Sequence, residues 1–137
     1  MDPTIARWTG WATVAFIVMA ALVPITTRLY MGKRGAPGSP PVRAHVLIGL
    51  TTAAFTFLHT IVILPALGSP GATGGGMLAI APACAAFLLL VVHAGLGLQL
   101  RDPRLRTRTQ KRRAHVALAI TIATLVGVHA AVLLRSA

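Results

Sequence analysis

Two pairs of histidines occur at the same spacing in two apolar segments of this 137-residue chain. His45 and His59 are fourteen residues apart, and so are His115 and His129. Fourteen residues make close to four turns of an α-helix, with a rise of about 21 Å. In a left-handed bundle that repeats every ~3.5 residues, both members of a pair lie on one face of their helix. Two such helices that face each other would offer two imidazoles at each of two depths.

Two neutral imidazoles at one depth are the protein ligands of a low-spin, six-coordinate haem iron. The sequence therefore predicts two haems, one held by His45 and His115 and the other by His59 and His129. No Cys-x-x-Cys-His attachment motif occurs, so both haems are expected to be non-covalent haem b. Helix geometry would separate the irons by about 20 Å. Such a stack would pass electrons through most of a bilayer core.

The segments around these histidines repeat each other. Arg43-Ala-His-Val recurs as Arg113-Ala-His-Val seventy residues later, and the same offset aligns His59 with His129. The repeat indicates a duplicated helical hairpin, in which the second and fourth apolar segments are equivalent and parallel. Parallel helices place equivalent histidines at the same depth.

The composition is that of a membrane protein. The chain is 55% hydrophobic and 11% charged, with a mean hydropathy of +0.77, whereas soluble domains are usually about 25% charged. Four segments approach the length of about 20 apolar residues that crosses a bilayer. We therefore expect an all-α, polytopic membrane four-helix bundle that forms one domain over residues 1–137. The expected helices cover about 8–30, 44–67, 77–100 and 114–134.

Basic residues predict how the bundle is oriented. They surround the first and third loops, whereas the middle loop, 68–76, has none. The positive-inside rule then places loops 31–43 and 101–113 in the cytoplasm and both termini outside a bacterial-type plasma (inner) membrane. The basic residues that lie in or flank these two loops are Arg28, Lys33, Arg34, Arg43, Arg101, Arg104, Arg106, Arg108, Lys111, Arg112 and Arg113.

This topology also accounts for other features of the chain. A formal charge of +11 would suggest nucleic-acid binding in a soluble protein, but here the charges lie between apolar segments and no nucleic-acid partner is expected. Trp8 and Trp11 would lie at the outer interface, which indoles prefer. The first segment lacks a basic n-region and a small-residue cleavage site, so it is expected to remain a helix of the mature protein.

Haem propionates need cationic or hydrogen-bonding partners. Arg43 and Arg113 each precede a histidine by two residues, which suits the haem on the cytoplasmic side. Arg135 lies six residues after His129, within reach of the outer haem. The alternative role for all three arginines is anchoring at the membrane surface.

The fifth histidine, His93, has no partner in the repeat. It lies eight residues before Arg101, which predicts a position nearer the middle of the membrane than either histidine pair. It could hydrogen-bond a haem edge or a neighbouring helix, serve a quinone or proton site, or replace one of the four ligands. Cys84, the one cysteine, is expected to pack within the bundle.

Small residues near the histidines would leave room for a flat macrocycle, although glycine also favours ordinary close packing of membrane helices. The glycines concerned are Gly49, Gly95, Gly97 and Gly127.

Membrane histidines have other roles, which the pattern leaves open. They can join helices by hydrogen bonds or form a proton or metal-ion path. No Asp, Glu or second Cys accompanies the histidines in the apolar segments. Since divalent transport usually needs such ligands, their absence argues against a metal path.

The histidine pattern resembles the four-helix, two-haem core of respiratory cytochrome b, which has paired histidines on its second and fourth helices. Cytochromes b561 and the membrane domains of ferric reductases and NADPH oxidases use similar bundles. The resemblance covers about residues 8–134 and implies that His45, His59, His115 and His129 are axial ligands. The 137 residues hold no flavin or nucleotide domain, unlike a reductase that draws electrons directly from a nicotinamide.

The expected function is therefore transmembrane electron transfer, by a small cytochrome or by a subunit of a larger complex or oligomer. The alternative is a self-contained oxidoreductase of the ferric reductase or superoxide:quinone oxidoreductase type. Membrane quinol, a cytoplasmic flavoprotein and an external oxidant are the candidate redox partners. The basic loop 101–113 is expected to contact anionic lipid or to dock an acidic cytoplasmic redox protein.

Overall fold

The computed structural model describes residues 3–32, 34–67 and 76–136, and all regular structure in these ranges is helical. The four-helix, all-α architecture expected from the sequence is confirmed. The helices are α1 (Pro3–Met31), α2 (Pro40–Ile63), α3 (Gly76–Gln99) and α4 (Arg108–Ser136), and a short 3-10 turn, η1 (Leu64–Ala66), follows α2.

All four helices are long and apolar enough to cross a membrane. Their candidate spans are 21 to 28 residues long, with mean hydropathies between 1.8 and 2.3. Large apolar side chains cover the outer surface, including Leu29, Leu88 and Ile120, which are 76%, 65% and 64% exposed. Lipid is as apolar as these side chains, so the helices need not bury them to be stable.

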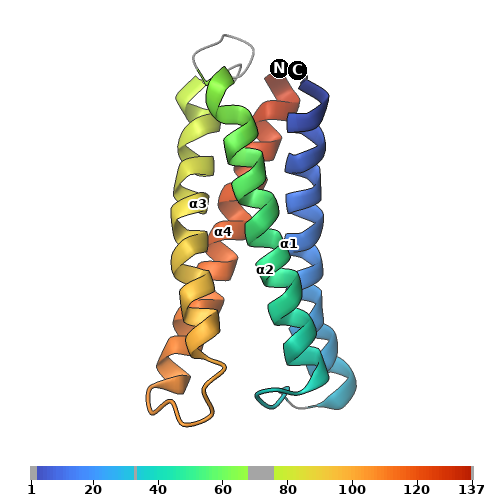
Figure 1. The fold of residues 1–137 in the computed structure, drawn as a ribbon, viewed down its shortest axis with the longest axis vertical. Coiled ribbons are helices and arrows are strands. Elements are labelled where there is room, and N and C mark those ends of the chain that lie inside the picture. Colours follow the sequence, from blue (N-terminus) through green and yellow to red (C-terminus); the bar gives the residue numbers. More distant parts are fainter. Residues whose placement is uncertain (1–2, 33, 68–75, 137) are drawn as a thin grey trace.

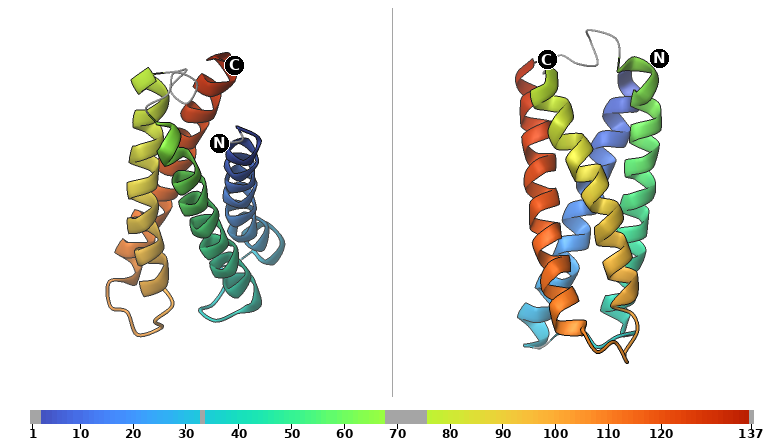
Figure 2. Two further views of the ribbon diagram at one scale, coloured as in Figure 1. Left: turned by 45° about the horizontal axis from the view of Figure 1, so that its top comes forward. Right: turned by 90° about the vertical axis from the view of Figure 1, so that its left-hand side faces the viewer.

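The helices form two antiparallel hairpins, α1–α2 and α3–α4 (Figure 1). In both views of Figure 2, α2 and α4 run in the same direction, as the repeat predicts. The beginning of α1 and the end of α4 lie at one end of the bundle, which we call the terminus end. Segments 34–39 and 100–107 lie at the other end, which we call the loop end.

Contacts between the hairpins are fewer than those within them, and they run mainly between α2 and α3. One of them joins Phe57 to Phe87, with ring centroids 4.9 Å apart. Within the first hairpin, Phe16 and Phe55 pack with centroids 5.0 Å apart. Toward the loop end the two hairpins diverge (Figure 1).

Three helices, α1, α2 and α4, begin four to six residues earlier than the hydropathy predicted. The α2 helix begins at Pro40 because proline is well suited to a first turn, where its missing N–H is not needed. The α4 helix begins at Arg108, so the second half of the predicted loop 101–113 is helical. Arginine and lysine are good helix formers.

Side chains at the start of α4 also tie it to the end of α3. The guanidinium of Arg108 donates to the carbonyl oxygens of Leu100 and Asp102 at 2.7 and 2.8 Å. The amine of Lys111 donates to the side-chain oxygen of Gln99. Lys33 and the linker 68–75 lie outside the described residues.

Candidate functional site

The structure brings His45 and His115 together at the loop end. Their ring centroids are 6.1 Å apart and their planes stand at 81°. Each ring is held by the other helix of its own hairpin. Nδ1 of His45 lies 2.9 Å from the carbonyl oxygen of Ala20 in α1, and Nδ1 of His115 lies 3.2 Å from that of His93 in α3. We call these two histidines the loop-end pair.

His59 on α2 and His129 on α4 are the corresponding histidines toward the terminus end, and we call them the terminus-end pair. Nδ1 of His59 lies 3.1 Å from the carbonyl oxygen of Ala6 and 3.1 Å from the hydroxyl of Thr9, both in α1. Nδ1 of His129 lies 2.8 Å from the carbonyl oxygen of Ala79 in α3. The predicted pairing by depth therefore matches the arrangement of the helices.

The four Nδ1 atoms share one chemical environment, and this fixes the tautomer. A carbonyl oxygen only accepts hydrogen bonds, so each Nδ1 carries the proton and donates it. In a neutral imidazole this leaves the lone pair on Nε2. Metal-binding histidines are held in this way, because the second hydrogen bond orients the ring and raises the basicity of the ligating nitrogen.

The carbonyl acceptors themselves repeat with the period of the histidines. Ala6 and Ala20 are fourteen residues apart in α1, and Ala79 and His93 are fourteen apart in α3. This follows from helix geometry, because both helices of a hairpin rise equally per residue and the histidines on one of them are fourteen residues apart. The sequence does not reveal these acceptors, because every residue has a backbone carbonyl and the side chain does not show which one accepts a hydrogen bond.

Two glycines make room for the rings. A Cβ at Gly97 would lie 3.2 Å from Cε1 of His115, and one at Gly10 would lie 3.1 Å from Cε1 of His59. Gly97 was among the glycines singled out in the sequence, whereas Gly10 was missed because it lies far from any histidine along the chain. At the other three glycines that the sequence singled out, an added methyl group would meet no atom within 4 Å: Gly49, Gly95 and Gly127.

His93 does not lie where the sequence predicts. Its ring is stacked on that of His115, with centroids 3.8 Å apart and planes at 13°. It therefore shares the depth of the loop-end pair, and the prediction of a position nearer the middle of the membrane is wrong. The reason is that α4 begins at Arg108, so His115 lies two turns inside the helix. At that depth its ring packs beside His93 of α3.

Each histidine pair could give two imidazole ligands to a metal centre. Within the described residues, no three His, Cys, Asp or Glu side chains gather to hold a metal ion. A bare transition-metal ion would have only two protein ligands at either pair, fewer than the four of a structural zinc site. A haem brings four ring nitrogens and needs only two imidazoles. Cys84 contributes to neither pair, because it lies exposed on α3 rather than packed in the bundle.

Basic side chains gather at the loop end. Arg112 interacts electrostatically with Arg28 and Arg34 of the first hairpin and with Arg108 and Arg113 of its own helix. Basic residues of the first and third loops thus lie together, as the topology requires. The side chains of Arg43, Arg113 and Arg135 are exposed, and their contact with haem propionates stays a prediction.

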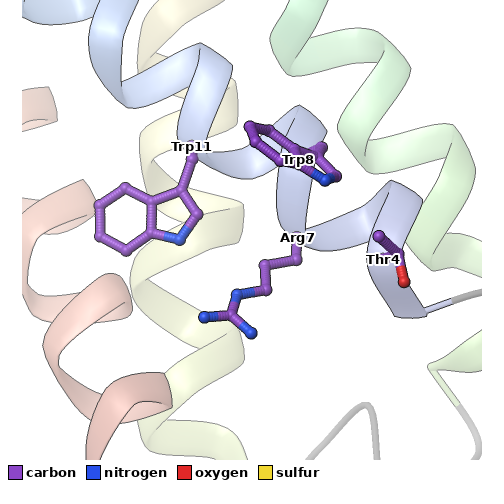
Figure 3. Close-up of a pocket in the computed structure, with 4 residues that line it drawn as sticks. All are labelled: Thr4, Arg7, Trp8 and Trp11. Atoms are coloured by element: carbon purple, nitrogen blue, oxygen red, sulfur yellow. The ribbon is translucent and has the colours of Figure 1, made fainter.

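The terminus end carries a different surface. A shallow pocket there is lined by four residues in the first turns of α1, which Figure 3 shows: Thr4, Arg7, Trp8 and Trp11. Trp8 and Trp11 are 72% and 46% exposed. Exposed indoles near the end of a membrane-spanning helix are typical of the lipid–water interface.

Comparison with known proteins gave no match, whether to family models, to characterised proteins or to solved structures.

Proposed function

We propose that this protein binds two b-type haems and transfers electrons between them across a membrane. The observation that carries the proposal is the state of the four paired histidines. Each donates its Nδ1 proton to a backbone carbonyl of the neighbouring helix, at positions that repeat every fourteen residues. Four Nε2 atoms are thereby kept as ligands, two at each depth.

The geometry of the loop-end pair supports this assignment. Two imidazoles bound to one metal ion through bonds of about 2.0–2.1 Å have ring centroids about 6 Å apart. The centroids of His45 and His115 are 6.1 Å apart. The gap between these two rings therefore has the width that a shared metal ion requires.

The chain supplies binding, spacing and a water-poor environment, while the haem, when bound, supplies reversible one-electron chemistry. The unbroken α2 helix places His45 and His59 about 21 Å apart along its axis. Exposed Arg43 and Arg113 suit the propionates at the loop end, and Arg135 suits those at the terminus end.

The proposed setting is a bacterial-type plasma membrane, with the basic loop end in the cytoplasm. Its cationic surface would attract anionic lipid or an acidic redox protein. Quinol or quinone in the membrane and an external oxidant are the other proposed partners. The protein would act as a small cytochrome or as a subunit of a larger complex.

The test is a reduced-minus-oxidised visible spectrum of detergent-purified protein, with the haem content measured as pyridine haemochrome. We expect about two haems b per chain with low-spin bands, since each haem uses one histidine pair. A protein without haem, from cells supplied with ample haem, would end the proposal and favour a proton path or purely structural histidines.

Single variants test the pairing. His115→Ala and His45→Ala should each remove the loop-end haem, while His59→Ala should remove the terminus-end haem. Val92→Ala is the matched control, because Val92 lies in α3 with 54% of its surface exposed. Loss of the same haem from His59→Ala and His115→Ala would contradict the pairing by depth.

A further inference from the structure

His93 contacts one of the proposed ligands in two independent ways. Its ring lies flat on the ring of His115, with centroids 3.8 Å apart and planes at 13°. Its backbone carbonyl oxygen accepts the Nδ1 proton of His115 at 3.2 Å. The hydrogen bond sets the tautomer of His115, and the stacked ring opposes rotation of its imidazole plane.

The first hairpin has no counterpart to this stacked ring. Ala20 occupies the equivalent position in α1 and gives its carbonyl oxygen to His45 at 2.9 Å, but its methyl side chain offers no flat surface. The two ligands of the loop-end pair are therefore held differently, and their planes stand at 81° to each other.

Stacking also shows that His93 is not a third ligand. An imidazole binds a metal ion in the plane of its ring, along the lone pair of a nitrogen. Two nearly parallel rings with centroids 3.8 Å apart cannot both point at the same iron.

We propose that His93 is a positioning residue for the loop-end haem, which holds the His115 imidazole nearly perpendicular to that of His45. This inference rests on the proposed function, because it concerns the orientation of an axial ligand. It assigns His93 to the support of a ligand rather than to a quinone site, a proton site or ligation itself.

The proposal has a spectroscopic consequence. In low-spin ferric haem, the anisotropy of the electron paramagnetic resonance signal depends on the angle between the two axial imidazole planes. Nearly perpendicular planes give a signal with a large maximum g value, and nearly parallel planes give an ordinary rhombic signal. We therefore expect a highly anisotropic signal from the loop-end haem, which is identified as the signal that disappears in His115→Ala.

The experiment compares variants of the full-length, haem-loaded protein. His93→Leu removes the flat ring but keeps the backbone carbonyl, so it isolates the effect of stacking. We expect His93→Leu to keep two haems per chain. The maximum g value of its loop-end signal should fall, or that signal should broaden. His93→Phe restores a flat ring and should keep the wild-type signal, as should Val92→Ala at the neighbouring exposed position. His93→Met is a second variant without a flat ring, should His93→Leu fail to accumulate.

Two results would overturn the inference. A loop-end signal that is unchanged in both His93→Leu and His93→Met would show that stacking does not set the ring plane. Loss of one haem from all three His93 variants would make His93 a ligand. These outcomes differ from failure of the proposed function, in which the wild-type protein itself binds no haem.

Discussion

At the scale of single residues, the chemistry of the histidines is decided by atoms that a sequence does not display. The fourteen-residue spacing predicts which histidines share a depth, and the structure brings the loop-end pair together at 6.1 Å. What makes Nε2 the free nitrogen is a carbonyl oxygen on the adjacent helix, such as that of Ala79 opposite His129. Because every residue carries a carbonyl, only the packing of two helices reveals which one is the acceptor.

The glycines give a prediction at this scale. Gly97→Ala adds a methyl group that would lie 3.2 Å from Cε1 of His115, so the ring must shift by a few tenths of an ångström. We expect weaker retention of the loop-end haem, measured as haem content after dilution into haem-free detergent. Alanine is about 1 kcal/mol better than glycine in a helix interior, so a loss of haem could not be attributed to a weaker helix.

Gly95→Ala is the control, because nothing lies within 4 Å of its added methyl group. It should keep both haems. Gly10→Ala, at 3.1 Å from Cε1 of His59, should weaken the terminus-end haem instead. Equal haem retention in all three variants would mean that the rings have more freedom than the structure allows.

At the scale of helices, hydropathy was sufficient to predict four elements and their order, but it could not predict where each begins. The basic run before His115 was expected to be a loop because it is charged, yet Arg108 begins α4 and donates a hydrogen bond to the carbonyl oxygen of Leu100, just after α3. The same early start brings His115 beside His93. The error in the depth of His93 thus came from one misplaced helix boundary rather than from the histidine itself.

Helix register gives a prediction at this scale. One alanine inserted after Ala54 in α2 would turn the rest of the helix by about 100° relative to what precedes it. His45 and His59 could then no longer face α4 together, and we expect one haem per chain instead of two. The haemochrome assay measures this directly.

The control is one alanine inserted between Pro103 and Arg104, in the segment that joins α3 to α4. This insertion leaves every helix register intact, so two haems should remain. Two haems in the α2 insertion variant as well would contradict a common ligand face.

At the scale of the whole molecule, the parallel α2 and α4 put all basic loops at one end and both chain ends at the other (Figure 1). The sequence predicted this arrangement from its basic residues. The structure adds that Arg112 of the second hairpin experiences electrostatic repulsion from Arg28 and Arg34 of the first. Which end faces the cytoplasm follows from the positive-inside rule and is open to a direct test.

The test labels single cysteines in a Cys84→Ala background, which removes the native thiol. Leu67→Cys lies at the terminus end, where Leu67 is 39% exposed, and should react in whole cells with an impermeant thiol reagent. Ala36→Cys lies at the loop end, where Ala36 is exposed, and should react only after the cells are opened. The opposite pattern would invert the proposed topology.

The division into two hairpins has a consequence for the ancestry of the protein. Each hairpin holds one histidine of each pair together with the carbonyl that orients it, so a lone hairpin contains no complete site. An ancestral hairpin would have reached the same arrangement only as a homodimer, with its two-fold axis along the membrane normal. In such a dimer every substitution appears twice. Fusion into one chain removes that constraint. Ala20 in α1 and His93 in α3 occupy equivalent positions, and a symmetric dimer could not carry different residues there.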